Sequence, residues 1–116
     1  MGDKTLMMTM LLDFYGDMLT PKQRSCFNMH YNEDLSLAEI AEVMDISRQG
    51  VRDLIVRTEA TLIETERKIG LVKRFSEQKK VFDRMEEELA ELLKLTDGKA
   101  AELTQKLRSE LDSIRE

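Results

Sequence analysis

The chain has 116 residues, which is enough for one domain or for one small domain with an appendage. Charged residues make up 35% of it, aromatic residues only 5%, and tryptophan is absent, so the composition favours helices and argues against a sheet. The net charge of −5 argues against tight, independent nucleic-acid binding, because such binding draws most of its affinity from a basic surface.

Two helices are predicted in the first third of the chain, over residues 4–15 and 21–31. Thr20 and Gln23 have the spacing of a capping box around Pro21, and Gly16 stands where the first helix can end. The first helix carries two apolar stripes, one of Leu6, Met7, Met10, Leu11 and Phe14 and the other of Met8, Leu12, Tyr15 and Leu19. Two stripes predict burial on both sides, within the fold or against a second chain.

The stretch "SLAEIAEVMDISRQGVRDLIVRT" (residues 36–58) has the spacing of a helix-turn-helix. Ala41 is the small residue at the helix crossing, Asp45 is a turn residue that tolerates the left-handed region, and Val51 is the branched apolar residue of the second helix. Ser36 and Ser47 are the predicted caps of the two helices. The second helix should continue to Gly70 with a core stripe of Val51, Leu54, Ile55, Thr58, Leu62 and Ile69.

The segment after Gly70 predicts a helical hairpin. Its first helix has a heptad seam of Phe75, Gln78, Phe82, Met85, Leu89 and Leu92. Residues 96–98 break the pattern, and a second stripe follows, made of Ala100, Leu103, Leu107, Leu111 and Ile114. We expect the two stripes to face each other, and the hairpin to pack on the first helix or on another subunit.

The sequence also resembles known families. "LTPKQRSCFNMHYNEDLSLAEIAEVMDISRQGVRDLIVRTEATL" is similar to region 4 of bacterial sigma-70-type factors. Together with "LLDFYGDMLTPKQR" and the charged helical tail, it resembles the YlxM family (UPF0122 type) of small helix-turn-helix proteins, closely over about the first 70 residues. The resemblance implies a regulatory role in the signal recognition particle pathway, because the genes of that family typically neighbour those of the particle.

We therefore predict an all-α fold, with a sigma-70 region 4-like helix-turn-helix domain in residues 1–70 and a C-terminal helical hairpin in residues 71–116 for oligomerisation or partner binding. The candidate nucleic-acid-binding residues are Ser47, Arg48, Gln49, Arg52, Val56 and Arg57 on the second helix of the motif, with Lys22 and Arg24 on the helix before it. Arginine pairs bidentately with guanine and glutamine with adenine, while lysine and serine suit phosphates.

Each candidate also has a structural interpretation that needs no nucleic acid. Arg48 can pair with Glu39 or Asp45, and Arg57 has the i,i+4 spacing to pair with Asp53. Two functions remain open. The chain either acts as a DNA-binding regulator that works as a homodimer or higher homo-oligomer, or it is an adaptor that binds signal recognition particle RNA or protein.

Other classes of function are not supported by the sequence. The five glycines form no phosphate loop, and no catalytic set of side chains stands out, so we expect no enzyme and no cofactor. Cys26 and His30 are the only cysteine and histidine, so we expect no metal site and no intrachain disulfide, as in cytoplasmic proteins. The apolar run at residues 6–12 is too short to span a bilayer, so we expect no membrane insertion.

Overall fold

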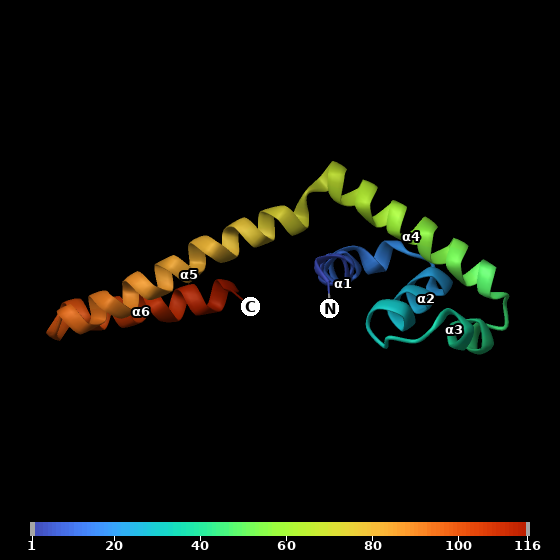
Figure 1. The fold of residues 1–116 in the computed structure, drawn as a ribbon. Coiled ribbons are helices and arrows are strands. Elements are labelled where there is room, and N and C mark those ends of the chain that lie inside the picture. Colours follow the sequence, from blue (N-terminus) through green and yellow to red (C-terminus); the bar gives the residue numbers. More distant parts are fainter. Residues whose placement is uncertain (1, 116) are drawn as a thin grey trace. The chain divides into compact units, whose positions relative to one another are not determined.

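A computed structural model describes residues 2–115, and these residues form six α-helices and one 3-10 helix with no strand (Figure 1). The all-α prediction is confirmed. The elements are α1 (Asp3–Tyr15), η1 (Gly16–Met18), α2 (Pro21–Tyr31), α3 (Leu37–Met44), α4 (Arg48–Ile69), α5 (Leu71–Leu95) and α6 (Gly98–Arg115). The chain divides into two compact units, the first ending at Val72 and the second beginning at Lys73. We call residues 2–72 the N-terminal domain and residues 73–115 the hairpin.

The predicted capping boxes define where α2 and α3 begin. At α2, the Gln23 N–H donates to Thr20 Oγ1 at 3.1 Å, and Gln23 Oε1 accepts from the Thr20 N–H at 3.0 Å. Ser36 and Glu39 make the same reciprocal pair at α3, at 2.9 and 3.1 Å. These bonds satisfy amide groups that a helix start otherwise leaves unpaired, and losing one such cap costs about 1 kcal/mol.

Two apolar clusters form the core of the N-terminal domain. The first joins α1, α2 and α4 and consists of Met8, Leu11, Leu12, Tyr15, Leu19, Phe27, Leu62 and Val72. The second lies under the helix-turn-helix and consists of Cys26, Met29, Ile40, Ala41, Val51 and Ile55. Full burial of one large apolar side chain contributes about 1.5–3 kcal/mol. The second cluster, which contains residues of both α3 and α4, therefore fixes how these two helices cross.

A polar junction joins the end of α4 to the start of α5. The Tyr15 hydroxyl donates to Glu66 Oε1 at 2.6 Å and accepts from the Leu71 N–H at 3.1 Å, while the same Glu66 oxygen accepts from the Val72 N–H at 3.0 Å. Gly70 makes the turn between the helices with a left-handed backbone (φ 71°). The first amide groups of α5 therefore have partners from α1 and α4.

A second tyrosine ties α2 to the middle of α4. The Tyr31 hydroxyl donates to Glu59 Oε1 at 2.7 Å, and Lys4 Nζ lies 3.4 Å from the other Glu59 oxygen. Burial, together with the hydrogen bond and negative charge of Glu59, raises the pKa of Tyr31 well above its ordinary value. Tyr31 therefore stays protonated and keeps donating to α4.

The predicted apolar stripes are only partly buried. The stripe of Met8, Leu12, Tyr15 and Leu19 is buried within the fold, but Leu6 and Met7 of the other stripe are 63% and 46% exposed, so its burial against a second chain stays a prediction. The prediction of Ile69 as a core residue is wrong, since Ile69 is 46% exposed although it shares the helical register of the α4 core stripe. Its position explains this result, because Ile69 lies two turns beyond Leu62, the last buried residue of α4.

The hairpin shows a second departure. The least exposed residues of α6 follow a spacing of three and four along the helix, and they are Ala101, Thr104, Arg108, Leu111 and Arg115. Arg115 forms ion pairs with Asp83 and Glu86 of α5, which identifies this side of α6 as the one that faces α5. Of the predicted α6 stripe, Leu103, Leu107 and Ile114 are 60%, 44% and 64% exposed. The prediction that the two apolar stripes face each other is therefore wrong for most of α6.

Candidate nucleic-acid interface

The helix-turn-helix consists of α3, the turn after it and the first half of α4. Ala41 is 8% exposed and Val51 is fully buried, and both belong to the same core cluster. Asp45 adopts the left-handed conformation (φ 56°, ψ 45°), and the N–H groups of Asp45 and Ile46 both donate to the Ala41 carbonyl. The crossing residue, the turn residue and the branched apolar residue thus occupy the places that their spacing predicts.

The outward side of α4 carries two rows of side chains in its first three turns, because residues four apart lie nearly above one another. One row is Arg48, Arg52 and Val56, and the other is Gln49, Asp53 and Arg57. All six are exposed, including Val56 at 55%. Five of the predicted site residues, Arg48, Gln49, Arg52, Val56 and Arg57, therefore share one surface, which we call the reading surface.

The three arginines of the reading surface have no intramolecular partner. Within residues 2–115, the side chains of Arg48, Arg52 and Arg57 make neither a hydrogen bond nor an ion pair. The alternative pairings of Arg48 with an acid of the first helix or the turn, and of Arg57 with Asp53, do not occur. Three guanidinium groups, each with five N–H donors, are therefore free to contact a ligand.

The other polar groups at this end of α4 already have partners. Ser47 caps α4, since its hydroxyl accepts the Gly50 N–H at 3.0 Å. Gln49 Nε2 donates to Asp53 Oδ1 at 2.9 Å. This bond uses one amide hydrogen of Gln49 and leaves its other hydrogen and its oxygen free, which are the two groups that a bidentate contact with adenine requires.

The two basic candidates on α2 differ from each other. Arg24 Nη1 lies 2.7 Å from Asp17 Oδ1 in a hydrogen-bonded ion pair, so its charge is neutralised locally. The Arg24 guanidinium also packs over Gly16, where a Cβ atom would lie only 3.4 Å from Arg24 Nε. Lys22 is exposed and forms no ion pair within the described residues. Of this pair, Lys22 is the better candidate for a phosphate contact.

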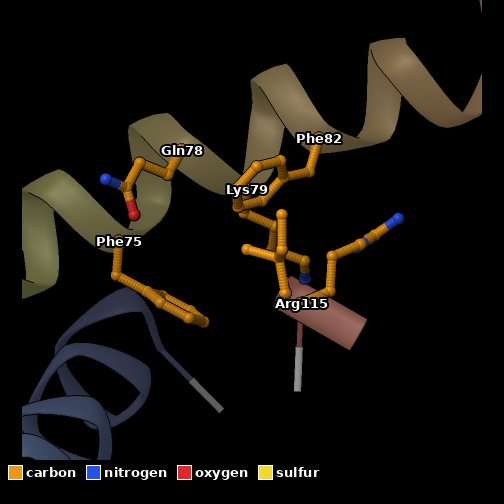
Figure 2. A pocket seen from close by; sticks show the side chains of 6 residues that line it. Phe75, Gln78, Lys79, Phe82 and Arg115 are labelled. Atoms are coloured by element: carbon orange, nitrogen blue, oxygen red, sulfur yellow. The ribbon is translucent and has the colours of Figure 1, made fainter. Parts of the chain in front are cut away.

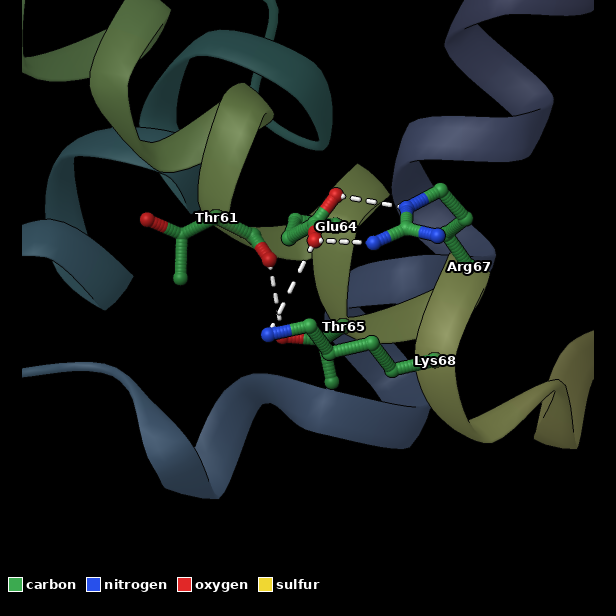
Figure 3. Close-up of polar contacts among 5 residues, drawn as sticks. All are labelled: Thr61, Glu64, Thr65, Arg67 and Lys68. Carbon is green, nitrogen blue, oxygen red and sulfur yellow. Dashed lines mark hydrogen bonds and ion pairs between the residues drawn. The ribbon is translucent and has the colours of Figure 1, made fainter.

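The basic residues near the end of α4 are engaged on the helix itself (Figure 3). Glu64 accepts from Arg67 at 2.6 and 2.9 Å, and Lys68 Nζ lies 3.7 Å from the same carboxylate. Arg67 and the neighbouring Lys68 charge together hold the pKa of Glu64 below its ordinary value. Within α4, the arginine side chains without a partner are thus confined to its first half.

Local charge favours an anion at the reading surface, although the whole chain is acidic. Residues 48–57 contain three arginines and one aspartate, and the first turn of α4 has no acidic residue. The exposed N–H groups and the positive end of the helix dipole lie at this same terminus. The Glu39 carboxylate of α3 accepts from the Ser36 N–H in the α3 cap, and its hydrogen bonding with Ser36 lowers the pKa of this carboxyl.

The chain matches, over residues 2–106, the family described as "Putative helix-turn-helix protein, YlxM / p13 like". The chain belongs to this family. A UPF0122 protein of Caldanaerobacter subterraneus subsp. tengcongensis is 51% identical over 87 residues, covering 75% of this chain and 74% of the relative. A UPF0122 protein of Bacillus licheniformis is 48% identical over 96 residues, or 83% of each chain, and one of Listeria innocua is 43% identical over 89 residues, or 77% of this chain and 81% of the relative.

The family match confirms the predicted relationship and extends it. The sequence resemblance was close over about the first 70 residues, whereas the matched range also includes all of α5 and half of α6. The family model therefore covers most of the hairpin sequence, up to residue 106.

Two side-chain contacts of the site are not among the sequence-based predictions. The Gln49–Asp53 bond has the i,i+4 spacing of a common helical pair, so the spacing alone could have indicated it. The Arg24–Asp17 pair crosses the turn between η1 and α2, and no helical spacing indicates such a contact.

The structure offers little to support other chemistry. Cys26 is 1% exposed, and burial raises the pKa of its thiol, which disfavours the thiolate that a nucleophile or metal ligand needs. Among residues 2–115, no three His, Cys, Asp or Glu side chains are grouped to hold a metal ion. No helix in that range is both long and apolar enough to cross a membrane.

Proposed function

We propose that the chain is a DNA-binding regulator that reads the major groove with the first half of α4. The observation that carries this proposal is the set of three exposed, unpaired arginines on the second helix of an intact helix-turn-helix. In such motifs, the N-terminal residues of the second helix contact base edges. The proposed activity takes place in the cytoplasm, where a bacterial chromosome lies.

Each residue of the reading surface has a proposed contact. Arg48 and Arg52 donate bidentately to guanine O6 and N7, and Gln49, oriented by Asp53, contacts adenine. Val56 provides an apolar surface for a thymine methyl group. Lys22, Arg57 and the capping Ser47 contact phosphates, with a smaller share from the paired Arg24.

A single reading surface should give only low affinity for DNA. Few phosphate contacts are available on a chain with a net charge of −5, so a monomer should bind weakly and with strong salt dependence. A homodimer would double the contacts and fix two half-sites. We therefore propose that the active form is dimeric.

An adaptor function is the second candidate, and the charge distribution favours it. The exposed acidic side chains of α5 between Glu87 and Glu91 would suit a basic partner, such as an RNA-binding protein of the signal recognition particle. The resemblance to the YlxM family supports a role in that pathway for either candidate. Charge reversal in this segment should impair adaptor activity and leave DNA binding intact.

A paired fluorescence anisotropy titration would test the proposal. One probe is DNA from upstream of the chain's own operon, and the other is signal recognition particle RNA, each over a salt series. The Arg48→Ala/Arg52→Ala variant should lose sequence preference, at about 1–3 kcal/mol for each lost base contact. The matched control is Arg67→Ala/Lys68→Ala, which removes two charges from the same helix where they are already paired with Glu64.

The two outcomes separate the candidates. Sequence-preferring DNA binding that the first variant loses and the control retains would support the regulator. Equal binding by all three proteins, or binding of the RNA alone, would refute the reading surface and favour the adaptor.

A further inference from the structure

Each helix of the hairpin carries two seams, and only one of them is used within the hairpin. On α5, the inner seam of Phe82, Glu86, Leu89 and Leu93 is partly buried. Beside it lies an exposed apolar seam in which Val81, Met85, Leu92 and Leu95 are 42%, 41%, 42% and 76% exposed. At about 100° per residue, these seams lie roughly 100° apart around the helix.

The α6 helix repeats this arrangement. Its inner seam contains the buried Thr104 and Leu111 together with Arg115, which pairs with α5 and lies near Phe82 at one end of the hairpin (Figure 2). Its exposed seam contains Leu103 and Leu107, again about 100° away.

The two exposed seams lie on the same side of the hairpin. Met85 and Glu88 of α5 and Leu107 of α6 line one groove of about 220 Å³, which Leu89 and Leu111 of the inner seams also line. Together the exposed seams form what we call the outer face, made of Val81, Met85, Leu92, Leu95, Leu103 and Leu107. An exposed apolar face of this kind is typical of an interaction surface.

On each helix, the inner and exposed seams lie roughly at right angles, and this arrangement indicates which kind of partner would cover the outer face. In a four-helix bundle every helix contacts two neighbours, so it needs two such seams, whereas a helix in an isolated hairpin needs only one. The hairpin contributes two antiparallel helices, so a second hairpin would complete such a bundle.

The charges beside the outer face are complementary to a second copy of themselves. Counted from Asp97 in the turn, Glu88 and Lys106 are each nine residues away, and Arg84 and Glu110 are each thirteen residues away. Each acid on one helix is therefore level with a base on the other. None of these four side chains forms an ion pair within the described part of the chain.

We propose that the outer face binds the outer face of a second copy, forming an antiparallel four-helix bundle about a two-fold axis that runs along the hairpin. Such an axis places α5 of one copy against α6 of the other, with Glu88 beside Lys106 and Arg84 beside Glu110 across the interface. The bundle is independent of DNA, and it supplies the dimer on which the proposed function relies.

Sedimentation of the full chain without DNA would test the proposal. The wild type should sediment at twice the chain mass of 13.5 kDa at micromolar concentration. Leu103→Glu should weaken association at least about 100-fold, because it buries an unpaired charge in the bundle core. Leu6→Glu is the matched control, since Leu6 is 63% exposed on α1 and Leu103 is 60% exposed on α6. A monomeric wild type, or a dimer that Leu6→Glu dissociates and Leu103→Glu does not, would overturn the proposal.

A charge swap tests the two-fold arrangement without risk to the fold. Glu88→Lys and Lys106→Glu should each weaken the dimer, and the double variant should restore it, while Glu87→Lys, on the side of α5 away from the outer face, should have no effect. Failure of the double variant to restore association would refute this register. Because these measurements contain no DNA, their failure is distinct from failure of the proposed reading surface.

Discussion

At the left-handed turn residue of the helix-turn-helix, we predict that glycine gives a more stable protein than alanine, which is the reverse of their order inside a helix. Asp45 has φ 56° and ψ 45°, and its side chain makes no hydrogen bond or ion pair within residues 2–115. This conformation costs a residue with an ordinary side chain about 1–2 kcal/mol, and glycine does not have this cost. Glycine instead loses conformational entropy on folding that is worth about 0.5–1 kcal/mol more than the loss for alanine. Asp45→Gly should therefore be more stable than Asp45→Ala by about 0.5–1 kcal/mol.

The same pair of substitutions at Glu42 gives the control. Glu42 is exposed within α3 and has ordinary helical geometry, so Glu42→Ala should be more stable than Glu42→Gly by about 1 kcal/mol. The order of alanine and glycine should thus reverse over a distance of three residues.

Urea unfolding followed by tyrosine fluorescence measures both pairs in the full chain. The chain has two tyrosines and no tryptophan, and Tyr15 and Tyr31 both lie in the N-terminal domain. The signal therefore reports on that domain and not on the hairpin. If Asp45→Ala proved as stable as Asp45→Gly, the turn would not require a left-handed residue, and the cost assigned to its backbone conformation would be wrong.

Three further predictions concern the core. Burial and Glu59 raise the pKa of Tyr31, so the Tyr31 hydroxyl keeps its proton to higher pH in the folded state than in the unfolded state. The free energy of unfolding that this contributes should be fully present below the ordinary pKa of 10 and should fall above it by up to about 1.4 kcal/mol per pH unit. Tyr31→Phe should remove that decline in alkaline urea titrations. Leu62→Ala should lower the free energy of unfolding by about 2–5 kcal/mol, whereas Ile69→Ala should change it by less than about 1 kcal/mol; equal losses would contradict the observed limit of the core. The Cys26 thiol should react with a thiol reagent only as fast as the domain opens, and rapid labelling of the native protein would contradict its burial.

Features set by neighbouring residues in the sequence could be predicted. Both capping boxes, the left-handed Asp45 and the buried Val51 depend on contacts within a few residues, so short spacings specify them. The family and the all-α fold also followed from such patterns. For the same reason, the reading surface could be placed from the position of Val51 alone.

Features set by packing between distant segments could not be predicted. The register of Ile69 matches the α4 core, but the sequence does not show where the elements that cover α4 end. Similarly, α6 has two seams that could pack against α5. Arg115, which forms ion pairs with α5, lies on the less apolar of the two. Apolar periodicity identifies which residues need burial, and it does not identify which partner provides it.

The reading surface and the outer face can be separated by one last experiment. If binding two half-sites through one dimer provides most of the affinity, Leu103→Glu should weaken DNA binding about 10²–10⁴-fold while the remaining binding keeps its sequence preference and its response to Arg48→Ala/Arg52→Ala. The arginine variant should show the opposite pattern, with an intact dimer and no preference. An anisotropy titration paired with sedimentation measures both properties on the same samples. Wild-type affinity in the monomeric Leu103→Glu variant would show that one reading surface suffices, so the acidic charge of the rest of the chain would not limit binding.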